Sequence, residues 1–207
     1  MRSAAPSLNI AAVTPATRAL GPGLRAAVWV QGCPFDCHGC IAPEWISDIP
    51  AHSMTPDEVA ERLLADPEVD GLTFSGGEPM AQARGLARVA QIARARRDLS
   101  VICFTGFRLE RLTRDPPAPG VPELLRQIDV LIDGRYVAAL NDGTGLRGST
   151  NQRVHHLTGR LRGFDLEHQP RRAEVSLSGR DLTIIGIPPR HVLTSLGTAT
   201  GRAKESP

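Results

Sequence analysis

Lysine is almost absent from this sequence of 207 residues. Of the 24 basic residues only Lys204 is a lysine, and the rest are arginines. The body of the fold therefore offers no lysine for Schiff-base chemistry. Long apolar runs are missing too, and no segment approaches the roughly 20 residues of a membrane span, so we expect no membrane partner. The formal net charge of +2 gives no electrostatic reason to expect nucleic-acid binding.

Cysteine is also scarce, and its distribution is uneven. Three of the four cysteines, Cys33, Cys37 and Cys40, lie within eight positions, and the fourth is Cys103. This bunching is a poor basis for disulfides, and residues 1–20 lack the charged start and long apolar core of a signal peptide. We therefore expect a cytoplasmic protein whose thiols are free or metal-bound. Cys103 lies in an apolar run and is expected in the core.

Strands and helices are predicted to alternate along the first two-thirds of the chain. The apolar runs RAAVWVQG, GLTFSGG, SVICFTG and DVLIDG each end at glycine and predict buried strands. TPDEVAERLLAD predicts a helix, with Thr55 as N-cap, Pro56 at the first helical position and Glu58 completing a capping box. MAQARGLARVAQIARARRD and VPELLRQ predict two more helices. This alternation indicates an α/β fold with a parallel sheet. Four strands are too few for a closed barrel, so we expect a partial, open β/α barrel.

The pattern changes after residue 157. The segment AEVSLSGRDLTIIGIPP predicts a β-hairpin that turns at Ser178-Gly179. Residues 193–207 are small and polar, which is typical of a disordered tail. We therefore predict a main domain over 1–157, a C-terminal extension with a hairpin over 158–192, and a tail over 193–207.

Polar or glycine-rich motifs follow each of the four predicted strands. In βα sheets and barrels the carboxyl ends of the strands build the active site, because the loops there converge on one face. Four such motifs at four strand ends are harder to explain by packing than any one alone. They predict one site, formed by the cysteines and by Gly76, Gly77, Glu78, Pro79, Thr105, Gly106, Asp133 and Arg135.

The spacing C-x3-C-x2-C puts three thiolates on one tight loop. Zinc is one interpretation, because three cysteines with His38 or a remote histidine could close a tetrahedral site. Adjacent residues such as Cys37 and His38 rarely both turn onto one ion in so short a loop. A cubane [4Fe-4S] cluster fits better, since three irons take the three cysteines and the fourth iron keeps no protein ligand. That open iron would bind another molecule.

The cysteine spacing, followed by GGEP after the next strand, resembles the radical S-adenosylmethionine (SAM) enzymes. The closer resemblance is to the small glycyl-radical-activating proteins of anaerobic ribonucleotide reductases. It covers about two-thirds of the chain, in the expected order, through GPGLR, WVQGCP, CIAPEW, GLTFSGGEP, FTGF, DVLIDGRY and RGSTNQR. The resemblance implies the partial barrel of radical SAM enzymes.

The same resemblance implies two cofactors and two protein partners. The cofactors are a [4Fe-4S] cluster and SAM, which the reduced cluster cleaves to methionine and a 5′-deoxyadenosyl radical. That radical would take a hydrogen atom from the α-carbon of a glycine in a separate glycyl-radical enzyme. A low-potential electron donor such as flavodoxin or ferredoxin would reduce the cluster.

The resemblance also suggests roles for single residues. Gly76, Gly77 and Pro79 would meet the methionine portion of SAM, with Glu78 near its ammonium group; a plain glycine turn is the alternative. Thr105 and Gly106 would line the site. Asp133 and Arg135 would lie near SAM or the substrate backbone, or else form a solvated surface turn.

For the remaining candidates the interpretation is more open. Arg147, Asn151 and Gln152 would hydrogen-bond SAM or the incoming glycine loop, or only organise the chain. Gly21 and Gly23 with Arg25 could form a backbone lip over the cysteine loop. Trp45 is expected to pack over the cluster. No side chain is assigned a catalytic role beyond the cluster ligands, and His155 and His156 are assigned none.

Two features depart from the wider pattern. Gly39 stands where many radical SAM enzymes have an aromatic residue near the adenine, although the small reductase activators often share that glycine. The chain also runs about 50 residues past RGSTNQR, which leaves the partner open. The alternatives are a radical SAM enzyme acting on a small molecule or peptide, and a non-catalytic iron–sulfur or zinc module. The second alternative, a non-catalytic module, does not explain the GGEP motif at residues 76–79.

Overall fold

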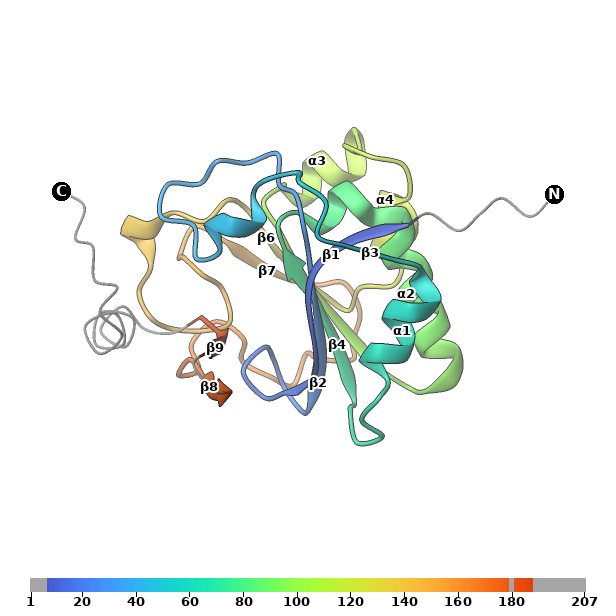
Figure 1. Cartoon of the computed structure of the whole chain (residues 1–207). Helices are drawn as coiled ribbons and strands as arrows, with labels where there is room; N and C mark the ends of the chain where they lie inside the picture. The colour runs from blue at the N-terminus through green and yellow to red at the C-terminus, as the bar shows by residue number, and fades with distance from the viewer. Residues whose placement is uncertain (1–6, 179–180, 188–207) are drawn as a thin grey trace.

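A seven-stranded sheet organises the chain (Figure 1), as seen in a computed structural model that describes residues 7–178 and 181–187. Its spatial order is β3-β1-β2-β4-β5-β6-β7. The central strands β2, β4, β5 and β6 run parallel, and β1, β3 and β7 join antiparallel at the two sides. The strands are β1 (Leu8–Thr17), β2 (Arg25–Val30), β3 (His52–Met54), β4 (Gly71–Gly76), β5 (Ser100–Thr105), β6 (Val130–Asp133) and β7 (Arg153–His156).

The four parallel strands are the four that the sequence predicts, so the α/β class and the mostly parallel sheet are confirmed. Strands β1, β3 and β7 were not predicted. The sheet has two separate edges, at β3 and β7, and is therefore open. Residues 188–207, with the predicted tail and the end of the predicted extension, lie outside the described residues, as does Gly179 of the predicted turn.

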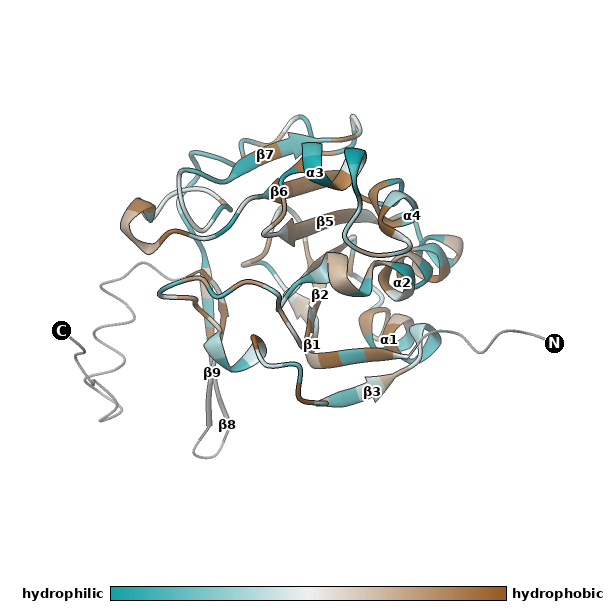
Figure 2. Cartoon of the chain, turned by 90° about the horizontal axis from the view of Figure 1, so that it is seen from above, coloured by the Kyte–Doolittle hydropathy of each residue, from teal (hydrophilic) through white to brown (hydrophobic). Residues whose placement is uncertain are grey.

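The helices cover one face of this sheet (Figures 1 and 2). The predicted capping box at Thr55 is confirmed, because Glu58 N–H donates to Thr55 Oγ1 and Thr55 N–H donates to Glu58 Oε2. In the described residues no helix is long and apolar enough to cross a membrane. The helices are α1 (Pro56–Leu63), α2 (Ala83–Arg96), α3 (Leu109–Arg114) and α4 (Val121–Leu125), with 3-10 turns η1 (Pro43–Trp45), η2 (Pro79–Gln82) and η3 (Ala138–Leu140).

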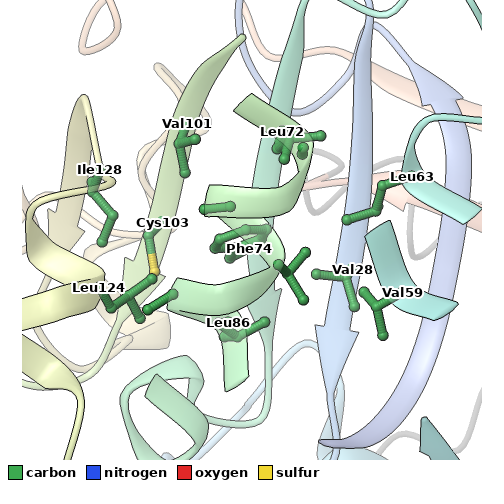
Figure 3. Close-up of a cluster of buried hydrophobic side chains, with 14 of the residues drawn as sticks. Val28, Val59, Leu63, Leu72, Phe74, Leu86, Val101, Cys103, Leu124 and Ile128 are labelled. Carbon is green, nitrogen blue, oxygen red and sulfur yellow. The ribbon is translucent and has the colours of Figure 1, made fainter. Parts of the chain in front are cut away.

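Alternation along the parallel strands separates a core face from a site face. Val28, Phe74 and Cys103 point toward the helices and belong to one buried cluster (Figure 3). Cys103 is fully buried there, as its sequence context predicts. The residues that follow Val28 and Phe74, Trp29 and Ser75, face the opposite side and line a cavity.

The C-terminal segment lies on the side of the sheet that the helices leave open (Figure 1). Its leucines, Leu161 and Leu166, pack in a second buried cluster with Ile102, Val130 and Ile132 of β5 and β6. The predicted hairpin is present as β8 (Ala173–Ser178) and β9 (Asp181–Gly186), paired antiparallel. The helices and the C-terminal segment thus cover opposite faces of one sheet.

Candidate functional site

A cavity of about 540 Å³ lies at the carboxyl ends of the parallel strands. This volume falls in the range of small-molecule sites. The convergence expected from the strand ends is therefore present. The predicted residues that line the cavity are Cys33, Cys37, Cys40, Gly76, Gly77, Pro79, Thr105, Gly106 and Arg135, together with Trp45 and Gln152.

The end of the cysteine loop lies beside its beginning, just after β2. Gly32 N–H donates to Trp45 O at 3.0 Å, and Cys33 N–H donates to Ile46 O at 3.0 Å. The Gln31 side-chain amide donates to Ser47 O at 2.6 Å and to Glu44 O at 3.2 Å. These bonds close residues 32–47 into a loop whose three thiols all line the cavity.

Burial makes two of these thiols poor acids on their own. Desolvation raises the pKa of the Cys33 thiol to about 11, and it also raises the pKa of Cys37. A thiolate at neutral pH therefore needs a cation beside it, and iron would supply that charge with release of protons. The donor set is thus one that a metal cluster would convert to thiolates.

The arrangement fits a cluster better than a single ion. His38, the adjacent nitrogen donor considered for zinc, is exposed and is not among the residues that line the cavity. Within the described ranges no three His, Cys, Asp or Glu side chains gather closely enough to hold one metal ion. A cubane binds each thiolate to a different iron and so accepts thiols spread around a cavity.

The glycine pair lies directly against the cysteine loop. A Cβ on Gly77 would stand 2.1 Å from Gly32 O, and Gly76 has a φ of +111°, which L side chains rarely adopt. Gly77 N–H donates to Val30 O at 2.7 Å, and Glu78 N–H donates to Gly32 O at 2.8 Å. The two motifs that the sequence singled out are therefore joined backbone to backbone, and only glycine fits between them.

Glu78 does not line the cavity but lies behind it, 1% exposed. Its Oε1 accepts from Met80 N–H and from the Thr105 hydroxyl, both at 2.8 Å, and its Oε2 accepts from Gly106 N–H at 2.8 Å. The carboxylate thus ties the end of β4 to the end of β5. Its contact with a SAM ammonium group stays a prediction.

The buried carboxyl of Glu78 should make stability depend on pH. Burial raises its pKa from 4.5 to about 7, against the opposing effect of the three hydrogen bonds. The folded chain then holds this proton more tightly than the unfolded chain. The stability linked to it is fully present below about pH 4.5 and is lost as the pH rises through about 7, by on the order of 3 kcal/mol.

Urea unfolding of the wild-type chain and of Glu78→Gln between pH 4.5 and 8 tests this expectation. The free energy of unfolding of the wild-type chain should fall with rising pH relative to that of the variant. Two parallel curves would show that Glu78 is ionised throughout this range.

Asp133 also lies outside the cavity lining, at the centre of an ion-pair network. It is fully buried. Its carboxylate accepts from Arg153 at 2.6 Å, from Leu109 N–H at 2.7 Å and from Arg108 at 3.0 Å, and His155 Nε2 lies 3.0 Å away. Burial alone would raise its pKa, but these donors outweigh it and lower the pKa to about 2. The carboxylate is therefore ionised and joins β6 to α3 and β7.

Removing the Asp133 carboxylate should destabilise the fold. Asp133→Ala deprives the first N–H of α3 and two guanidinium groups of their shared acceptor, and we expect a loss of about 2–4 kcal/mol of unfolding free energy. Glu110 offers a matched control, because its exposed carboxylate binds the same Arg153, and Glu110→Ala should cost far less. Equal losses of unfolding free energy in the two variants would mean that burial of Asp133 contributes nothing to stability.

Arg135 lies at the wall of the cavity beside the cysteine loop. Its guanidinium stacks over the Phe35 ring at 4.5 Å, and Phe35 meets Phe107 edge-on at 4.7 Å. The backbone N–H of the next residue, Tyr136, hydrogen-bonds the Cys37 thiol. The segment after β6 thus touches the cysteine loop and presents one cation to the cavity.

The RGSTNQR segment is held from two sides. Gln152 lines the cavity, and its amide donates to Gly134 O at 2.7 Å and accepts from Gly148 N–H at 2.8 Å. Asn151 is not among the lining residues, and its side chain donates to Arg135 O at 2.9 Å. Arg147 pairs with Glu167 at 3.3 Å. In this structure Asn151 and Arg147 contact other parts of the chain, and their hydrogen bonds to SAM or to a glycine loop stay a prediction.

The expected lip of Gly21, Gly23 and Arg25 over the cysteine loop is wrong. Arg25 begins β2 and pairs with Gly71 at the start of β4, so it lies at the end of the sheet opposite the cysteines. Its guanidinium is fully buried and donates to Thr73 Oγ1 at 2.8 Å and Ser100 Oγ at 2.9 Å. Its role is to join three strands at their amino ends.

Several cavity residues were missed from the sequence. Trp29 packs against Trp45 with ring centroids 5.8 Å apart and the rings tilted by 43°, and period-2 alternation along β2 could have placed it on the site face. Phe35 lies two residues after Cys33 and carries no pattern of its own. Residues 183–187 of the hairpin also line the cavity, and nothing local in the sequence places the hairpin there.

Comparison with known proteins identifies a family to which the chain is similar. Residues 19–155 match the family described as a 4Fe-4S single cluster domain. The anaerobic ribonucleoside-triphosphate reductase-activating protein of Vibrio cholerae is 33% identical over 147 residues, 67% of this chain and 91% of that protein. The protein of that name from Escherichia coli K12 is 32% identical over 148 residues, 66% and 91% of the two chains. A pyruvate formate-lyase-activating enzyme of Staphylococcus aureus is 38% identical over 68 residues, 30% of this chain and 27% of the enzyme.

Proposed function

Because the chain belongs to the 4Fe-4S single cluster domain family, with the activating proteins of anaerobic ribonucleotide reductases among its relatives, we propose that it activates a glycyl-radical enzyme. It is a radical SAM enzyme that holds a [4Fe-4S] cluster and SAM. The single observation that carries this function is the convergence of three thiols and a glycine pair on one cavity at the parallel strand ends.

Each part of the cavity has a task in this reaction. Cys33, Cys37 and Cys40 would hold the cluster, and when reduced and bound the cluster supplies one electron for cleavage of SAM to methionine and a 5′-deoxyadenosyl radical. The Gly76–Pro79 segment would hold the methionine portion through its backbone, which lies directly against the cysteine loop because Gly77 has no Cβ. Arg135 lines the cavity and lies over Phe35 of the cysteine loop, and it would meet a carboxylate or a peptide carbonyl.

Other predicted residues act from behind the cavity. Thr105, through Glu78, would fix the β5 end against the glycine segment, and Asp133 would fix the segment that carries Arg135. Asn151 would hold the same segment through Arg135 O. Trp29 and Trp45 cover the cysteine loop with apolar surface, which lowers the local dielectric and restricts water near a cluster.

We further propose that the open sheet is the partial barrel of radical SAM enzymes. Residues 1–157 would form that barrel domain, with 158–192 as an extension and 193–207 as a tail. An open side would let a glycine-bearing protein loop reach the cavity. The enzyme would work in the cytoplasm with a low-potential donor such as flavodoxin or ferredoxin, and without nucleic acid or membrane.

The test is anaerobic reconstitution with iron and sulfide, followed by SAM and dithionite. We expect 5′-deoxyadenosine, and on addition of the anaerobic ribonucleotide reductase of the same organism we expect a glycyl-radical doublet in electron paramagnetic resonance (EPR). Absence of 5′-deoxyadenosine would favour a non-catalytic cluster module. 5′-Deoxyadenosine without a doublet would favour a small-molecule or peptide substrate.

A further inference from the structure

The β8–β9 hairpin lies outside residues 19–155, which match the family, yet it forms part of the cavity wall. Two polar anchors hold it in place. Glu174 of β8 accepts from the Thr17 hydroxyl at 2.5 Å and from Arg18 N–H at 2.8 Å, at the end of β1. Arg171, just before β8, donates to Asn141 Oδ1 at 2.6 Å and to Arg147 O at 2.6 Å. The hairpin is thus fixed to the end of β1 and to the segment 141–147.

The strand β9 meets the cavity with its edge. Thr183, Ile184, Ile185, Gly186 and Ile187 all line the cavity, whereas Ala173, Glu174 and Val175 of β8 do not. A strand that presented one face would contribute every second residue, because successive side chains point to opposite faces. Four consecutive residues of β9, followed by Ile187, indicate that the strand lies edge-on.

The edge that faces the cavity is unpaired within the described residues. β9 pairs only with β8, in a two-stranded sheet. Ser178 and Asp181 are partners with two residues between them in the sequence, and antiparallel partners with that separation are a hydrogen-bonded pair; such pairs alternate along the two strands. Val175 and Ile184 are then a non-hydrogen-bonded pair, and the backbone N–H and C=O of Ile184 point outward from β9.

We propose that this edge binds the glycine-bearing segment of the partner enzyme as an added β-strand. The inference rests on the proposed function and specifies how the partner is recognised. Main-chain hydrogen bonds to Ile184 would hold an extended segment inside the same cavity as the three thiols. Such bonds do not depend on a side chain, which suits a segment whose reacting residue is glycine.

Exposed apolar residues on the cysteine loop and on the segment beside it would receive the side chains of such a partner segment. Ile41 of the cysteine loop lines the cavity and is 44% exposed. Val137 and Leu140, at 38% and 43% exposed, flank Ala138, which lies against Gly39 of the same loop. At strand-addition sites an unpaired strand edge gives affinity through backbone bonds, and neighbouring apolar pockets receive alternate side chains.

Proline at Ile184 tests the edge. Ile184→Pro removes the outward N–H and leaves the β8–β9 bonds intact. Val175→Pro is the matched control, since it makes the same change in the cross-strand partner, on the edge away from the cavity. With the anaerobic ribonucleotide reductase of the same organism as partner, we expect glycyl radicals per 5′-deoxyadenosine to fall at least about tenfold in Ile184→Pro, and less than about twofold in Val175→Pro. Equal yields in the two variants overturn the proposal.

Hydrogen–deuterium exchange on the reconstituted wild-type enzyme avoids any effect of proline on folding. Addition of the reductase should slow exchange in the peptide covering 181–187 more than in 173–178. Unchanged exchange in both peptides overturns the proposal. So does protection of 181–187 that is present without partner and vanishes when residues 188–207 are removed, because the chain's own tail would then occupy the edge.

These outcomes are separate from failure of the proposed function. If the wild-type enzyme forms no 5′-deoxyadenosine or no glycyl radical, the function is wrong whatever the variants do. If it forms both and the edge variants behave alike, only the docking mode is wrong.

Discussion

Replacing any one of Cys33, Cys37 and Cys40 by alanine is expected to abolish 5′-deoxyadenosine formation. Each thiol lines the cavity and would hold a different iron, so no remaining side chain compensates for its loss. We expect a decrease of more than about 100-fold, beyond the 10–100-fold cost that is typical of outer-shell changes at metal sites. Iron and sulfide content after anaerobic reconstitution should fall in parallel.

Cys103 provides the control for this experiment. It is fully buried in the core, on the helix-covered face of the sheet (Figure 3), away from the cavity. Cys103→Ala should cost about 1 kcal/mol of stability and leave the iron content and the product yield unchanged. A variant of Cys33, Cys37 or Cys40 with full activity would refute its place as a cluster ligand.

The second large effect is expected at Gly77. A Cβ there would stand 2.1 Å from Gly32 O and 2.8 Å from Trp45 O, both backbone atoms of the cysteine loop. Gly77→Ala must therefore push the glycine segment off the loop and stretch the Glu78 N–H to Gly32 O bond. Since a shift of about 1 Å at a reacting site can cost about 100-fold in rate, we expect a loss of that size in 5′-deoxyadenosine formation.

Cluster assembly and SAM use should separate in this variant. Gly77→Ala keeps all three thiols, so its iron content should stay close to that of the wild-type enzyme while its affinity for SAM falls. Gly159→Ala is the control, because a Cβ at Gly159 would meet nothing within 4 Å. Wild-type affinity for SAM in Gly77→Ala would show that the close approach of the two loops has no part in binding.

The parallel centre of the fold was predictable because its strands are continuous apolar runs that end in glycine. The flanking strands were not, for reasons visible in β1 and β7. β1 contains Pro15, which lies where its pairing with β2 shifts register, and such a residue interrupts the strand pattern. The four residues of β7 are all half-buried, so they show no alternation.

The cysteines and the glycine pair could be found from spacing, because their chemistry depends on residues that are close in sequence. Glu78 and Asp133 could be identified from the sequence as candidate site residues, but their positions relative to the cavity could not be predicted. Glu78 follows β4 and Asp133 ends β6, yet each turns away from the cavity to bind backbone N–H groups and side chains of neighbouring elements, such as Gly106 and Leu109. Those partners are brought near only by the folded sheet. The hairpin likewise reaches the cavity through anchors to Thr17 and Asn141, more than 25 residues away along the chain.

The most direct measurement is the EPR spectrum of the reduced, reconstituted enzyme before and after SAM is added. An iron without a protein ligand will bind SAM, so the g values of the reduced [4Fe-4S] cluster should change when SAM is present. A spectrum that SAM leaves unaltered, or a cysteine loop that binds zinc in place of iron, would contradict the account.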